Sequence, residues 1–82
     1  MSFNSHKRKV LDESEPLEHR ASHARSCALH VANTLALERD AVIELVAKET
    51  GVSLHSAESA AHLMAAFEAL ERIRVQAVQA NA

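Results

Sequence analysis

The sequence predicts an all-α protein built on an antiparallel helical hairpin that hinges at Gly51. Hydrophobic residues make up 48% of the 82 residues but only two residues are aromatic, so the apolar content is mostly Ala, Leu and Val. That composition favours helices. One glycine and one proline are too few for the turns of a multi-stranded sheet. Apolar residues also recur at spacings of three and four, as they do along one face of a helix.

Residues 1–14 are predicted to form a mobile arm. The basic run from His6 to Lys9 is followed by the acidic residues Asp12, Glu13 and Glu15, and nothing in this segment repeats with a helical period. A segment with neither a period nor an apolar face has no reason to pack. The three cations Lys7, Arg8 and Lys9 could touch phosphates or an acidic protein patch, or serve only as a solubilising tail.

Helix one is predicted over about residues 15–50. Ser14, Glu15 and Pro16 form a helix start signal, because a hydroxyl caps free amides and proline suits the first turn. One apolar face then runs through Leu17, Ala21, Ala24, Ala28, Val31, Leu35, Val42 and Leu45. Residues 38–40 interrupt it. The absence of Gly or Pro there favours one continuous helix, and a bend with Asp40 capping a second segment is the alternative.

Helix two is predicted over about residues 54–79, after a short hinge. Gly51 ends helix one because glycine readily adopts the left-handed conformation that closes a helix, and Ser53 or Ser56 is the next candidate cap. The main stripe of helix two is Ala60, Leu63, Ala66, Phe67, Leu70, Ile73 and Ala77. So short a connection makes the two helices antiparallel neighbours.

A hairpin alone leaves apolar area uncovered, because two helices share only one seam. We therefore expect a homodimer that completes a four-helix bundle, or a complex with another protein. The candidate interface residues are Leu35, Val42, Leu63, Met64, Phe67, Leu70 and Ile73.

Composition also narrows the classes of function. Cys27 is the only cysteine, so no disulfide framework is possible within the chain, and a reducing cytoplasm is expected. No apolar run approaches the roughly 20 residues that span a bilayer, and the first residues do not resemble a signal peptide. No glycine loop, nucleophile elbow or paired carboxylate motif indicates an enzyme or a cofactor site.

Residues 46–53 resemble the turn of a helix-turn-helix DNA-binding unit. Ala47 and Gly51 fall at the small-residue and turn-glycine positions of that family, and Val52 matches the apolar residue that follows. The resemblance implies a recognition helix over residues 54–62. That stretch contains no Arg or Lys, the residues that usually contact phosphates and guanine, which argues against nucleic-acid binding.

His19, His23, Cys27 and His30 follow one another at spacings of four, four and three on one side of helix one. Neighbouring pairs could hold a transition metal, but the full set is too long for one ion. A histidine response to pH is a second possible role. A half-exposed polar face with a small buried thiol is the simplest interpretation, and we predict no metal site.

The sequence thus favours a small cytoplasmic regulator that binds protein, such as an anti-activator, adaptor or inhibitor that blocks a partner's interface. A DNA-binding dimer that uses the hinge region and basic arm is the alternative. A structural oligomer without a regulatory role is the third hypothesis.

Overall fold

The computed structural model describes residues 2–80, which form four helices. They are α1 (Phe3–Leu11), α2 (Leu17–Leu35), α3 (Arg39–Thr50) and α4 (Ala60–Ala80). No strand occurs within these residues, so the all-α prediction is confirmed. The two long helices of the predicted hairpin correspond to three shorter helices, α2, α3 and α4, and α1 is an additional helix.

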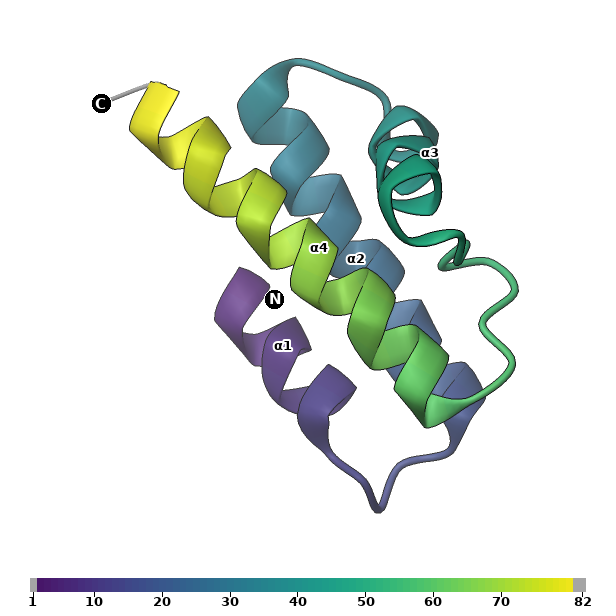
Figure 1. Ribbon diagram of the computed structural model, residues 1–82. Helices are drawn as coiled ribbons and strands as arrows, with labels where there is room; N and C mark the ends of the chain where they lie inside the picture. The colour runs from purple at the N-terminus through teal and green to yellow at the C-terminus, as the bar shows by residue number, and fades with distance from the viewer. Residues whose placement is uncertain (1, 81–82) are drawn as a thin grey trace.

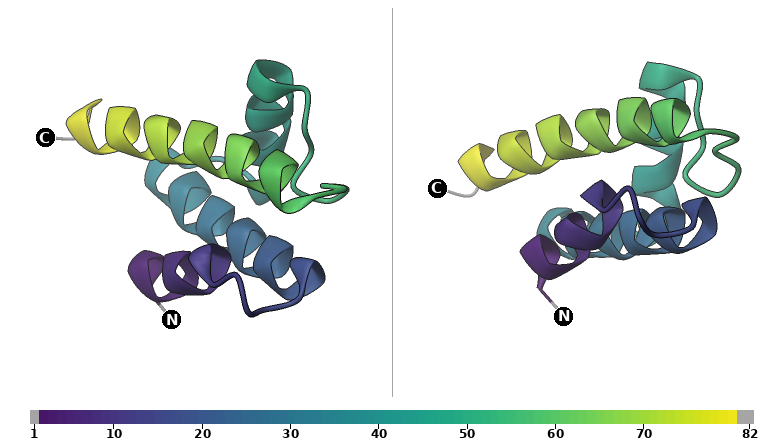
Figure 2. Two further views of the ribbon diagram at one scale, coloured as in Figure 1. Left: turned by 60° about the horizontal axis from the view of Figure 1, so that its bottom comes forward. Right: turned by 90° about the horizontal axis from the view of Figure 1, so that it is seen from below.

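Helix α2 is the centre of the fold and packs against each of the other three helices. In Figure 1, α4 crosses α2, with α1 and α3 lying on opposite sides of the crossing. Both views of Figure 2 show α3 standing steeply to α4 at one end of the molecule. The result is a bundle measuring 35 × 26 × 17 Å.

The segment predicted to be a mobile arm contains α1, so the structure differs from that prediction. The Ser2 hydroxyl caps the helix by accepting a hydrogen bond from the Ser5 amide at 3.2 Å. Phe3 and Val10 lie seven residues apart, on one face, and both are buried. Burial of these two side chains against the rest of the protein stabilises α1, although its sequence shows no apolar period.

Helix α2 begins at Leu17, two residues after the predicted start. Pro16 is the N-cap residue, one position before the first turn in which it was predicted to lie. The Ser14 hydroxyl does not cap the helix. It donates to the Asp12 carboxylate at 2.6 Å, within the turn that joins α1 to α2.

The prediction of one continuous helix through residues 38–40 is wrong. Ala36 adopts a left-handed conformation, with φ of 57°, and ends α2. The Leu37 amide donates back to the Ala32 carbonyl at 2.9 Å, which is the hydrogen bond of a Schellman closure. Glu38 precedes α3, and Asp40 lies in its first turn instead of capping it. A negative charge there suits the positive end of the helix.

Gly51 closes α3 as predicted, with φ of 76° and its amide bonded to the Ala47 carbonyl at 2.8 Å. The last helix, α4, begins at Ala60, so its start was predicted six residues too early. Residues 51–59 form a connection without regular secondary structure. Ser59 caps α4 by accepting a hydrogen bond from the His62 amide at 3.1 Å. The packing of Leu54, which is fully buried, keeps this connection against the bundle.

The core lies between α2 and the helices around it. Small side chains from α2, including Ala24, Ala28 and Ala32, are buried with large ones from α3 and α4. Small residues let helices approach closely, which suits so small a domain. No helix in the described part of the chain has both the length and the apolar character needed to cross a membrane.

Candidate functional site

The residues predicted to form a protein interface occupy two kinds of position. Val42, Leu63, Phe67 and Leu70 are fully buried in the chain's own core. Leu35, Met64 and Ile73 are partly buried and pack against that core. A hairpin alone would leave one face uncovered, but here Phe3 of α1 stacks on Phe67 and α3 packs against α4. In this conformation the four buried residues cannot contribute to a contact surface.

Exposed apolar side chains are found instead on the last turns of α4. Val75 and Val78 are 51% and 52% exposed, and they lie three residues apart, on one side of the helix. Figure 2 shows this end of α4 extending past the other helices. We call the exposed residues Thr34, Val75 and Val78 the α4-end surface.

A groove of about 220 Å³ runs beside Val78. Val31 and Thr34 of α2 form one wall and Ala77 of α4 forms another, with Phe3 of α1 nearby. The lining is of mixed polarity, because Thr34, His30 and Arg74 add polar atoms to those of the apolar side chains. A groove of this kind can take up a side chain presented by another helix.

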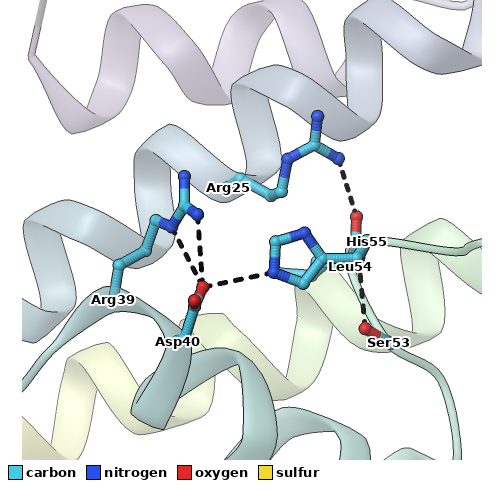
Figure 3. A network of polar contacts seen from close by, with 6 residues as sticks. All are labelled: Arg25, Arg39, Asp40, Ser53, Leu54 and His55. Carbon is cyan, nitrogen blue, oxygen red and sulfur yellow. Dashed lines mark hydrogen bonds and ion pairs between the residues drawn. The ribbon is translucent and has the colours of Figure 1, made fainter.

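A second candidate region is the polar network in Figure 3, where the 51–59 connection meets α2 and α3. The Asp40 carboxylate accepts a hydrogen bond from His55 Nε2 at 3.2 Å and others from the Arg39 guanidinium. The hydrogen bond from His55, followed by those from Arg39, lowers the pKa of Asp40. Arg25 donates to the Leu54 carbonyl at 2.9 Å.

The network places Ser53, His55 and Asp40 together, but not in the order of a catalytic relay. The Ser53 hydroxyl accepts a hydrogen bond from the His55 backbone amide at 3.2 Å. A nucleophile would need its hydroxyl against the imidazole ring, which would take its proton. The observed bonds instead fix the course of the connection, since they tie it to both α2 and α3.

The helix-turn-helix resemblance is only partly realised in the structure. Gly51 occupies the turn, as the resemblance implies, but residues 54–59 of the expected recognition helix belong to the connection. Only Ala60, Ala61 and His62 of that stretch are helical. The local geometry therefore does not present a recognition helix directly after the turn.

The histidine face of the sequence divides into two parts in the structure. His23 and His30 meet His6 of α1, with His6 and His23 joined by a 2.8 Å contact between their Nδ1 atoms. The ring centroids of His6 and His30 are 5.9 Å apart. His19 lies apart from them, with its Nδ1 atom 3.5 Å from the Glu15 carboxylate. His6 was not predicted to join this cluster, because it lies in the segment expected to be mobile.

Cys27 lies beneath this cluster and is fully buried. Its Sγ atom is 3.7 Å from the Phe3 carbonyl oxygen, and burial raises the pKa of the thiol to about 12. The thiol therefore stays protonated at neutral pH. Among residues 2–80, no group of three or more His, Cys, Asp or Glu side chains is arranged to hold a metal ion.

Comparison with protein-family models, curated proteins and solved structures gave no match to this chain. Its function is therefore inferred from the arrangement of its own residues.

Proposed function

We propose that this chain is a small cytoplasmic regulatory protein that acts by binding other proteins, as an anti-activator, adaptor or inhibitor that blocks a partner's interface. The observation that carries the proposal is the α4-end surface, where Val75 and Val78 are half-exposed and Val78 lines the groove beside α2. Apolar side chains gathered beside a groove are typical of a contact site. The cytoplasmic assignment rests on the single, reduced cysteine.

A second copy of the chain is the simplest occupant of this surface. The end of α4 offers valine side chains at helical spacing, and the groove beside it is lined by both apolar and polar residues. Two copies related by a twofold axis could each place an α4 end against the groove of the other. We propose such a homodimer, with the same surface available to a regulatory partner when the dimer dissociates.

Light scattering after gel filtration tests self-association. At micromolar concentration we expect a mass near twice the 8.9 kDa of one chain. A double variant, Val75→Gln with Val78→Gln, should be monomeric because it replaces the apolar contact and leaves the core intact. Leu11→Gln is the matched control, since Leu11 is 45% exposed at the far end of α1. A wild-type protein that stays at 8.9 kDa would contradict the homodimer.

Partner binding is tested separately. Wild-type protein and the double variant, immobilised at equal density, are exposed to lysate of the native cell, and the retained proteins are compared by mass spectrometry. We expect at least one protein retained by the wild type and by Leu11→Gln but not by the double variant. Identical sets from all three proteins would refute the role of the α4-end surface. A dimer with no specific partner would instead favour a structural oligomer.

The alternative function, DNA binding, depends on cations that can contact phosphates. Two of the three cations of the basic run form ion pairs, Lys7 with Glu71 at 2.7 Å and Lys9 with Glu15 at 3.6 Å. Arg8 is exposed. We expect weak, sequence-indifferent binding in a gel-shift titration, because phosphate contact would compete with those pairs. Nanomolar binding to one sequence at physiological salt would favour the DNA-binding dimer.

A further inference from the structure

Three imidazole rings meet where α1 lies on α2. His6 comes from the middle of α1, while His23 and His30 come from α2 and lie seven residues apart, on the same face. The His6 ring lies 5.1 Å from the His23 ring and 5.9 Å from the His30 ring, centroid to centroid. We propose that His6, His23 and His30 form a pH-sensitive latch, which holds α1 on the bundle at neutral pH and releases it in mild acid.

The 2.8 Å contact between the Nδ1 atoms of His6 and His23 makes the junction dependent on protonation. When both rings are neutral, one Nδ1 carries a hydrogen and donates it to the lone pair of the other. A single added proton can still be shared between the two nitrogens. After a second proton binds, both Nδ1 atoms carry hydrogens and neither can accept. The hydrogen bond is then lost and two cations face each other across the α1–α2 junction.

In the described part of the chain, no carboxylate forms an ion pair with His6 or His23 that would offset this repulsion. On α1, Lys7 neighbours His6, and its ammonium is bound to the Glu71 carboxylate of α4 at 2.7 Å. The other α4 group at this junction is Arg74, whose guanidinium lies over the Phe3 ring. On α2, the Cys27 thiol is neutral at these pH values because burial raises its pKa to about 12.

Two further ionisable groups lie at the junction between α1 and α2. Lys9 pairs with Glu15, and the Arg20 guanidinium donates to the Val10 carbonyl at the other end of α1. The pKa of His6 is lowered, first by burial and then by the charges of His23 and His30. The electrostatic effects on His6 thus all oppose its protonation while α1 is docked.

The direction of the response follows from this lowered pKa. A detached α1 takes up a proton at His6 more readily than a docked one, so the detached state binds more protons. Docking therefore weakens as the pH falls below the ordinary histidine pKa of about 6.5 and towards the lower value of the docked state. For one proton taken up, the opening constant rises by up to about tenfold per pH unit.

Cys27 provides a reporter for release. The thiol is fully buried and its Sγ atom lies 3.7 Å from the Phe3 carbonyl of α1, so it reacts only when α1 moves away. It is also the only cysteine in the chain. A dipyridyl disulfide reagent, which reacts with thiols in mild acid, measures the rate of exposure. Dividing this rate by that of the same chain unfolded in urea at the same pH removes the effect of thiol ionisation.

We expect this ratio to rise on the order of tenfold between about pH 7 and pH 5.5 in the wild-type protein. His6→Gln, which can donate an amide hydrogen to His23 but does not titrate, should give a flat ratio. His62→Gln is the matched control, because His62 is exposed on α4, outside the cluster. It should behave as the wild type does. Circular dichroism over the same range should show that α2, α3 and α4 remain helical.

A flat ratio in the wild type would overturn the proposal, as would an unchanged rise in His6→Gln. Loss of most helicity together with the rise would also overturn it, since the acid would then unfold the whole chain. If His6→Gln does not fold, His23→Gln removes the other half of the same hydrogen bond and is judged by the same outcomes. The test uses the free chain and does not depend on any partner.

Discussion

The aromatic ring of Phe3 stacks on that of Phe67, with ring centroids 6.4 Å apart and ring planes inclined by 20°. The guanidinium of Arg74 lies 4.2 Å from the centroid of the Phe3 ring. One end of α1 is thus joined to the middle of α4 by side chains, although α2 provides its main packing surface. The stacking explains why Phe67 is fully buried in a single chain.

Phe67→Ala should unfold most of the protein, because the site is in the core. Removing a fully buried phenylalanine costs about 3 to 5 kcal/mol, out of the roughly 5 to 15 kcal/mol that stabilises a typical domain. Urea unfolding followed by circular dichroism gives the loss directly. Val78→Ala, at a half-exposed site on the same helix, should change stability by about 0.5 kcal/mol or less. A Phe67→Ala protein as stable as Val78→Ala would contradict the assigned packing.

Arg20→Met should destabilise the α1–α2 junction. Arg20 is only 6% exposed, and its Nε donates to the Val10 carbonyl at 2.7 Å, in the last turn of α1. Methionine retains much of the apolar stem but leaves a buried carbonyl without its donor, which costs about 1 to 3 kcal/mol. The exposed Arg8→Met is the control. Equal urea midpoints for the two variants would show that the buried hydrogen bond contributes nothing measurable.

Two substitutions at residues with a left-handed backbone conformation should change the stability of the protein in opposite directions. Gly51→Ala should cost about 1 to 2 kcal/mol from backbone strain alone, because nothing lies within 4 Å of the added Cβ. Ala36→Gly should gain roughly 0.5 to 1 kcal/mol, since Ala36 carries that strain at φ of 57°. Thermal unfolding of both variants beside the wild type measures the difference. Shifts of the same sign would mean that backbone conformation does not dominate at these helix ends.

The titration of Asp40 should depend on His55. The hydrogen bond from His55 lowers the Asp40 pKa from its ordinary value of 3.8, so the folded state holds its proton less readily than the unfolded state. This contribution to stability is present above pH 3.8 and is lost as the pH falls through the folded pKa. In His55→Ala, the carboxyl carbon of Asp40 should titrate at higher pH in an NMR experiment. An unchanged midpoint would assign the shift to Arg39 alone.

The parts of the fold that were predicted correctly depend on local backbone chemistry. Gly51 ends a helix because of its own conformational freedom, and Pro16 marks the start of another to within two residues because it lacks an amide hydrogen. Both effects act over a few residues and are visible in sequence. The all-α class follows in the same way from composition.

The parts that were missed depend on contacts distant in sequence. α1 has no apolar period, and it is held by Phe3, Val10 and the hydrogen bond from Arg20. The break at Ala36 uses an alanine where glycine would be expected, so no residue type marks it. Residues 54–59 stay out of α4 in part because Arg25 bonds the Leu54 carbonyl. Phe67 was predicted to lie at an interface and is buried for the same reason, since the packing that covers it was not predicted.

The central position of α2 has a consequence for the order in which the chain folds. α1 and α3 adjoin α2 in sequence through the short links at residues 12–16 and 36–38, so both pairings close small loops. The α2–α4 pairing has to close a loop that contains all of α3 and the 51–59 connection, at a greater cost in chain entropy. Early folding events should therefore centre on α2, with α4 docking late. Substitutions in α2 would then slow folding, while substitutions in α4 would chiefly speed unfolding.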